Sequence, residues 1–182
     1  MKTVKNENNM VWLDMEMTGL DLEKETIIEI ATIITDGNLK ILAEGPNLVI
    51  HQPIKILNAM DEWNQNQHRK SGLIEEVKKS KISLKKAEKS TLDFIKQYCF
   101  PQTAPLCGNA IHHDRRFLIK YMPKLSAYLH YRHVDVTTIK LLVHRWYPET
   151  PDLPKKGDSH RALGDIRESI EELRFYRKNF FK

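Results

Sequence analysis

The 182-residue sequence has little cysteine and no long apolar run. Two cysteines, Cys99 and Cys107, are too few for a disulfide scaffold and lack the C-x-x-C spacing of a zinc site. We expect both to be small buried thiols. No stretch approaches the ~20 apolar residues that a membrane helix needs, and the opening MKTVKNENN has no apolar core of a signal peptide. These absences favour a cytoplasmic protein.

The overall composition allows one core and suggests an anionic partner. At 182 residues with 41% hydrophobic content, one domain spanning 1–182 is the default expectation. The formal net charge of +5 and the pI near 9.1 favour nucleic acid as a partner, although net charge alone indicates neither fold nor chemistry.

The first third of the chain predicts a three-stranded meander. Residues 10–17, 27–36 and 39–50 are rich in apolar and β-branched side chains and are separated by polar segments. The Asp-Gly-Asn sequence at 36–38 lies between two of these runs, which is typical of an antiparallel hairpin.

The rest of the chain predicts helices alternating with two further strands. From 55 to 98 apolar residues recur near every 3.6 positions, with six lysines between Lys78 and Lys89. Those lysines favour a solvated helix face, although phosphate binding stays open. Further strands are expected at 104–110 and 131–136, and helices at 113–122 (ended by Pro123), 137–146 and 160–179. The predicted fold class is α/β, a mixed five-stranded sheet flanked by helices.

Asp14 and Glu16 are the most unusual feature of the first strand. Side chains alternate along a strand, so residues two apart point to the same side, about 6 to 7 Å apart. Met10 and Trp12 share that side, which argues against the alternative of a solvated polar face. Two close carboxylates beside apolar neighbours repel each other unless they hold a proton or share a cation. Hard divalent ions such as Mg²⁺ or Mn²⁺ suit such oxygen ligands.

Three segments of the sequence resemble the three motifs of the DEDD exonuclease superfamily, in its histidine subclass. The first is LDMEMTGL, which holds Asp14 and Glu16; the second is GNAIHHDRRFL, which holds Asp114; the third is HRALGD, from His160 to Asp165. Together with YRHVDV and HRALGDIRESIEEL, these blocks resemble the oligoribonuclease family across nearly the whole chain. The resemblance implies a ribonuclease H-like fold and 3′-to-5′ hydrolysis of very short RNA, from dinucleotides to about pentamers.

The resemblance also implies which residues act. Asp14, Glu16, Asp114 and Asp165 would hold two divalent cations, Mg²⁺ or Mn²⁺, and His160 would be the catalytic base. If both were helical, His160 and Asp165 would point some 140° apart, so His160 is expected to precede the helix. Each of three residues could instead have a purely structural role. Asp114 could cap its helix, His160 could be an ordinary loop histidine, and Asp165 could be a favourable negative charge in the first turn of a helix.

A nearby acid, Asp135, receives no metal-binding role from the resemblance. It stands at the end of the fifth expected strand. We expect it to be structural, capping the helix that begins near Thr137.

Substrate contacts are likewise implied by the resemblance. Leu20 would wedge between bases, and Trp63 and His68 would line the pocket near the base and the terminal phosphate, although Trp63 as a core residue is the rival interpretation. Tyr131 and Arg132 match residues that reach the substrate of the neighbouring subunit in a homodimer. From the residues alone, Tyr131 would be an ordinary packing aromatic.

One block departs from the family pattern. Ala110 stands where the family usually has serine, and His112 and His113 stand where it usually has a small residue and glutamine. We therefore expect that the phosphate hydrogen bond of that serine is either missing or replaced by one from His112 or His113. If His113 is the replacement, His113→Ala should weaken dinucleotide binding with little change in metal affinity. An unchanged KM in this variant would exclude that role. Two alternative functions remain at this stage. They are a DNA or structured-RNA exonuclease with the same ligands, and a catalytically silent nucleic-acid-binding module.

Overall fold

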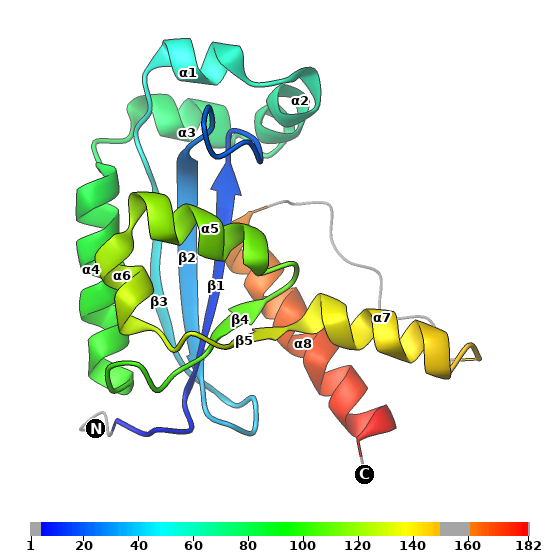
Figure 1. Ribbon diagram of the computed structural model, residues 1–182. Helices are drawn as coiled ribbons and strands as arrows, with labels where there is room; N and C mark the ends of the chain where they lie inside the picture. Colours follow the sequence, from blue (N-terminus) through cyan, green and yellow to red (C-terminus); the bar gives the residue numbers. More distant parts are fainter. Residues whose placement is uncertain (1–4, 150–160, 182) are drawn as a thin grey trace.

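One mixed sheet forms the centre of the computed structural model, which describes residues 5–149 and 161–181 (Figure 1). The strands lie in the order β3-β2-β1-β4-β5. β1 pairs antiparallel with β2 and parallel with β4, and β5 extends the parallel side. The strands are β1 (Met10–Met17), β2 (Ile27–Thr35), β3 (Ile41–Val49), β4 (Leu106–Gly108) and β5 (His133–Asp135).

Helices cover both sides of this sheet. Those that connect β3 to β4 are α1 (Ile54–Ala59), α2 (Glu62–Lys70), α3 (Leu73–Lys79) and α4 (Leu84–Tyr98). Those that follow are α5 (His112–Tyr121), α6 (Pro123–Tyr128), α7 (Val136–Trp146) and α8 (Ala162–Phe180). Within the described residues, no helix combines the length and apolarity that crossing a membrane requires.

The two faces of β1 belong to different cores. Val11, Leu13 and Met15 pack with α4, α5 and α6 on one side of the sheet. Trp12 packs on the other side with residues of α7 and α8, and its indole N–H donates to Thr35 Oγ1 at 3.0 Å. Because Asp14 and Glu16 continue the Trp12 side, both acids lie on the side of the sheet that α8 covers, and Asp165 in the first turn of α8 comes close to them.

The sequence-based prediction of the fold is confirmed, with corrections at the margins. All five strands form, but the fourth and fifth are only three residues long. Pro123 does end the preceding helix, yet it also begins α6, which was not predicted. Proline suits the first position of a helix because its missing N–H would have no partner there.

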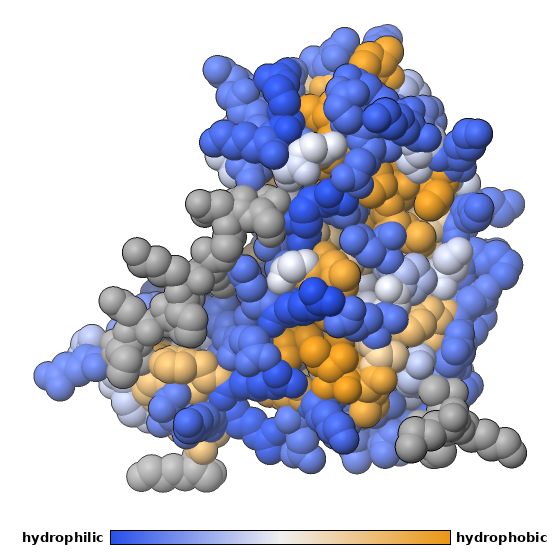
Figure 2. Space-filling view, turned by 180° about the vertical axis from the view of Figure 1, so that it is seen from behind, coloured by the Kyte–Doolittle hydropathy of each residue, from blue (hydrophilic) through white to orange (hydrophobic). Residues whose placement is uncertain are grey.

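The surface supports the solvated reading of the lysine run. All six lysines between Lys78 and Lys89 are exposed, and two of them pair with local acids, Lys78 with Glu75 and Lys89 with Asp93. Figure 2 shows one face of the molecule, on which polar side chains predominate and apolar ones appear in separate groups between them. Cys99 and Cys107 are buried free thiols, as expected.

Candidate active site

Three carboxylates from two distant parts of the chain converge at the end of β1. One oxygen each of Asp14, Glu16 and Asp165 lies within 4.8 Å of the other two. Asp14 and Glu16 come from alternate positions of β1, whereas Asp165 comes from the first turn of α8. The three side chains are half-buried, so a small ion can still reach them from solvent.

Asp114 lies beside this cluster and is fixed to β1. Its Oδ1 accepts the backbone N–H of Met15 at 3.0 Å, between the two acids of the strand. Asp114 is 5% exposed and stands in the first turn of α5, whose N-cap, Ile111, carries no side-chain capping bond. Its hydrogen bond to Met15 therefore attaches α5 to the acidic end of β1.

Burial and mutual repulsion make these acids hold their protons unusually strongly. Burial, followed by repulsion from Asp165, raises the pKa of Glu16 to about 8. Burial is also the main cause that raises the pKa of Asp114 to about 8. The pKa of Asp14 is raised well above its usual range, first by burial and then by repulsion from Asp114 and Glu16. Without a cation, this end of the sheet is under electrostatic strain.

The donor set fits a divalent cation. Among the described residues the cluster consists of carboxylates alone, and converging carboxylate oxygens are the ligands preferred by Mg²⁺ and Mn²⁺. A bound cation would also reverse the repulsion that raises the three pKa values. Asp14, Glu16 and Asp165 are therefore suited to hold a metal, with Asp114 adjacent.

The raised pKa of Glu16 predicts how the metal-free protein responds to pH. The folded carboxyl titrates near 8 and the unfolded one near 4.5, so between these values the folded state binds a proton that the unfolded state has released. Its contribution to the free energy of unfolding therefore falls as pH rises, by up to about 1.4 kcal/mol per pH unit. In EDTA, Glu16→Gln should stabilise the chain more at pH 8 than at pH 5, as measured by urea unfolding. An equal effect at both pH values would contradict this.

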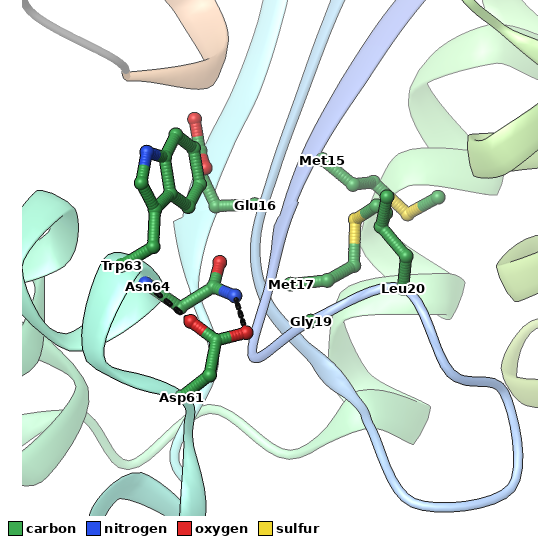
Figure 3. Close-up of a pocket in the computed structure, with 8 residues that line it drawn as sticks. All are labelled: Met15, Glu16, Met17, Gly19, Leu20, Asp61, Trp63 and Asn64. Atoms are coloured by element: carbon green, nitrogen blue, oxygen red, sulfur yellow. Dashed lines mark hydrogen bonds between the residues drawn. The ribbon is translucent and has the colours of Figure 1, made fainter.

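A pocket of about 500 Å³ opens beside Glu16. Trp63 of α2 and Leu20 of the loop after β1 stand on opposite sides of it, and Met15 and Met17 lie toward Leu20 (Figure 3). Trp63 is 66% exposed and Leu20 is 54% exposed, so the alternative of Trp63 as a core residue is wrong. Large apolar side chains held this exposed beside acids are typical of a ligand site.

Local hydrogen bonds explain why both walls are held in place. Asp61 caps α2 by accepting the N–H of Asn64 at 2.8 Å, which sets the first turn that carries Trp63. The loop that carries Leu20 is closed by Thr18, whose N–H donates to the carbonyl of Thr26 at 2.9 Å.

His68 lies behind this pocket rather than among the residues that line it. It is 2% exposed, and its Nε2 is 2.9 Å from the carbonyl oxygen of Met17. Its Nδ1 is 3.9 Å from Oε2 of Glu16. In this structure His68 therefore supports Glu16 and the end of β1.

Two other expected site residues lie away from the pocket, and a third lies outside the description. Tyr131 and Arg132 directly precede β5, and neither lines the pocket of its own chain. Tyr131 is 70% exposed, and the Arg132 guanidinium lies 5.2 Å from the centre of its ring. His160 lies outside the described residues. Asp165 lies in the first turn of α8, whose first residue is Ala162.

Asp135 has the structural role expected of it. Its Oδ1 accepts the N–H of Thr137 at 2.9 Å and so caps α7. The same oxygen accepts the N–H of Ala110 at 3.0 Å. Ala110 has a left-handed backbone, with φ of 47°, and this bond holds the turn that leads into α5.

The two histidines after Ala110 lie together at the start of α5. The rings of His112 and His113 are 4.0 Å apart, and His112 Nδ1 is 3.8 Å from Oδ2 of Asp135. Burial lowers the pKa of His113, which favours the neutral ring. A neutral imidazole can still donate one hydrogen bond to a phosphate.

Two charged residues of the site were missed from the sequence. Glu29 of β2 is fully buried opposite Glu16, and Arg161 reaches it from the start of α8. A single acid within the apolar run IIEIATIIT was the available signal for Glu29. Nothing in the local sequence pointed to Arg161 as its partner.

Comparison with known proteins gives this site a family. A family model described as RNase_T exonuclease matches residues 11–173. The chain is 55% identical to an oligoribonuclease of Klebsiella pneumoniae, covering 97% of this chain and 98% of that protein. It is 54% identical to an oligoribonuclease of Chromobacterium violaceum, covering 98% of each. The chain belongs to the oligoribonuclease family of exonucleases. It is thus a phosphodiester hydrolase of a metal-dependent 3′-to-5′ exonuclease family.

Solved exonuclease structures share the fold of this family member. An exonuclease I from Methylocaldum szegediense superposes with a TM-score of 0.69 at 17% identity, covering 96% of this chain and 41% of that one. Exonuclease I of E. coli, in complex with a dT13 oligonucleotide, gives a TM-score of 0.67 at 13% identity, covering 93% and 41%. This chain thus spans less than half the length of those proteins, and the shared part confirms the ribonuclease H-like fold.

Proposed function

We propose that this exonuclease degrades very short RNA, from dinucleotides to about pentamers, to 5′-mononucleotides, using two divalent cations. The observation that carries the proposal is the pocket of about 500 Å³ next to Glu16, with Trp63 and Leu20 as its walls. That volume lies within the roughly 300 to 1,000 Å³ of small-molecule sites. A short oligonucleotide fits such a pocket better than a long strand does, because a long strand needs an extended groove.

The four acids would hold the cations, Mg²⁺ or Mn²⁺. Asp14, Glu16 and Asp165 supply the converging oxygens, and Asp114 stands next to them with one oxygen committed to Met15. The two ions would supply Lewis-acid activation of water and stabilise the attacking and leaving oxygens of the phosphodiester. The protein's part is to fix these carboxylates in a half-buried site where electrostatic interactions are strong.

His160 would act as the base that removes the proton from the attacking water. The family resemblance assigns it this role, and an imidazole with an ordinary pKa near 6.5 suits proton transfer at neutral pH. In the sequence it directly precedes Arg161, the N-cap residue of α8.

Base contacts would come from Trp63 and Leu20. The indole can stack on any base, and Leu20 stands on the opposite side of the pocket, where it can wedge between two bases (Figure 3). Neither side chain reads hydrogen-bonding edges, so we expect little sequence preference. His68, whose Nδ1 lies 3.9 Å from Oε2 of Glu16, would support that metal ligand from behind the pocket.

The activity can be tested with three labelled substrates and Mn²⁺. A 5′-labelled pentaribonucleotide should shorten one nucleotide at a time from its 3′ end. A diribonucleotide should be cut faster than the DNA dinucleotide of the same sequence. Preference for the deoxy substrate would instead favour a DNA exonuclease, and binding without any cleavage would favour a silent nucleic-acid-binding module.

Replacing Trp63 by alanine should weaken substrate binding without disturbing the acids. Stacking on one base contributes roughly 1 to 3 kcal/mol, so the KM for a diribonucleotide should rise by about 5- to 150-fold. Mn²⁺ affinity, measured by calorimetry, should stay unchanged. Phe100→Ala is the control because Phe100 is an exposed aromatic after α4, at the end of the sheet where β1 begins. Equal KM values in Trp63→Ala and the wild type would exclude the stacking role.

We further propose that the chain acts as a homodimer in the cytoplasm. Tyr131 and Arg132 are exposed and do not line their own pocket, which suits residues that serve the substrate of a neighbouring subunit. The buried free thiols of Cys99 and Cys107 suit a reducing compartment. Light scattering tests the dimer, and cell fractionation tests the location.

A further inference from the structure

Glu29 is a fully buried acid in an unfavourable place. It stands directly opposite Glu16 in the β1–β2 register and is 0% exposed. Like charges directly opposite each other on neighbouring strands are destabilising, and a buried carboxylate requires a partner. The fold must therefore contain a cation that compensates Glu29.

Arg161 is that cation, and it binds two acids at once. Its Nη2 donates to Glu29 Oε1 at 2.8 Å, and its Nε is 3.1 Å from both Glu29 oxygens. Its Nη1 and Nη2 also donate to the two oxygens of Glu76, each at 2.8 Å. Only the planar guanidinium, with five donors in a fixed fork, can pair with two carboxylates in this way.

The contact extends to the backbone of α8. The N–H of Ala162 donates to Glu29 Oε2 at 3.3 Å, so the buried acid supplies the cap that Arg161, the N-cap residue, does not provide with its own side chain. One turn further, the N–H of Asp165 donates to the carbonyl of Arg161 at 3.1 Å. The position of the Asp165 carboxylate is therefore set by where Arg161 is held.

We propose that Glu29, Arg161 and Glu76 act as a clamp that positions Asp165 for metal binding, an inference that rests on the proposed two-cation function. Glu29 ties the start of α8 to β2 opposite Glu16, and Glu76 ties it to α3. None of the three is a metal ligand. They are positioning residues, and Arg161 joins three separate elements at the metal-binding end of the sheet.

Simple stabilisation of the fold does not explain this arrangement well. A buried ion pair is often no better for stability than apolar residues of similar volume. Residues that orient metal ligands, in contrast, typically change metal affinity or activity by about 10- to 100-fold when they are mutated. The clamp is therefore expected to affect cation binding beyond any change in stability.

The test is calorimetric titration of the metal-free full-length protein with Mn²⁺. Arg161→Gln should weaken Mn²⁺ binding by about 10- to 100-fold. The matched control is Arg167→Gln, because Arg167 also leaves α8 to make a forked contact with a strand acid, Glu44, at 3.2 and 2.7 Å. That contact lies on β3, away from the acid cluster, so its loss should leave Mn²⁺ affinity unchanged.

A second variant keeps the test decisive if Arg161→Gln does not fold. Arg161→Lys keeps the charge beside Glu29 but cannot hold two carboxylates in one plane, so it should fold and bind Mn²⁺ at least several-fold more weakly. Wild-type affinity in Arg161→Lys, or an equal loss in Arg167→Gln, would overturn the clamp. A wild type that binds no Mn²⁺ would contradict the proposed function as well, whereas unaltered variants would contradict the clamp alone.

Discussion

Asp14→Asn should lower kcat for hydrolysis of a diribonucleotide by at least about 10³-fold. Asp14 is one of the three carboxylates whose oxygens converge within 4.8 Å, and no other described residue joins that cluster. In the proposed two-cation site, loss of this ligand would remove a cation whose charge would contribute several kcal/mol to the transition state, and each 1.4 kcal/mol is about tenfold in rate. The substitution keeps the shape of the side chain, so the fold should persist.

Asp93→Asn provides the comparison for this prediction. Asp93 is an exposed acid of α4 that pairs with Lys89, and its loss should leave kcat unchanged. Release of labelled mononucleotide from pGpG with Mn²⁺ measures both variants. If Asp14→Asn keeps more than a tenth of the wild-type rate while its circular dichroism is native, the carboxylate cluster does not carry the chemistry.

Arg132→Ala should raise the KM for the same substrate by at least about 10²-fold. A hydrogen bond to a charged group contributes about 1.5 to 3 kcal/mol, and the guanidinium can donate two to one phosphate. Arg132 is exposed beside Tyr131 and does not line the pocket of its own chain. In the proposed homodimer, its loss should therefore act on the pocket of the second subunit.

Mixing two defective chains separates this arrangement from a contact within one chain. Asp14→Asn supplies an intact Arg132, and Arg132→Ala supplies an intact acid cluster. After unfolding and refolding together, mixed dimers should contain one complete site, so activity at low substrate should rise well above that of either variant. Activity equal to the average of the two separate variants would show that Arg132 does not act across the dimer.

The sequence predicted the framework of the fold because local pattern and tertiary structure agree there. Residues 10–17 match β1 at both ends, and the Asp-Gly-Asn turn joins β2 to β3 as expected. The alternation along β1 correctly placed Asp14 and Glu16 on the side of Trp12, because both faces of this central strand are buried and the register cannot slip.

Tertiary partners were beyond the reach of local patterns. Periodicity placed Asp165 on a helix, but only the fold shows its carboxylate within 4.8 Å of Asp14 and Glu16. Arg161 and Glu29 are 132 positions apart in sequence, so neither residue has a local signal for the other. His68 was expected at the pocket surface, yet it is buried against the carbonyl of Met17, a contact that depends on how α2 packs over the end of β1.

The exposure of Trp63 also required the structure. Tryptophan is usually largely buried, so composition alone could not choose between a core residue and a pocket wall. The cap at Asp61 fixes the first turn of α2 and leaves the indole 66% exposed beside Glu16. The pocket therefore results from helix placement, and its size is the basis for the short-substrate proposal.

The most direct test of the account is a competition in one reaction. Equal concentrations of pGpG and a 20-nucleotide RNA are incubated with the protein and Mn²⁺, and both are followed by chromatography. We expect pGpG to be converted to mononucleotide at least about tenfold faster than the 20-mer loses its 3′ nucleotide, and EDTA to stop both reactions. Preference for the 20-mer, or hydrolysis of pGpG that continues in EDTA, would contradict this expectation.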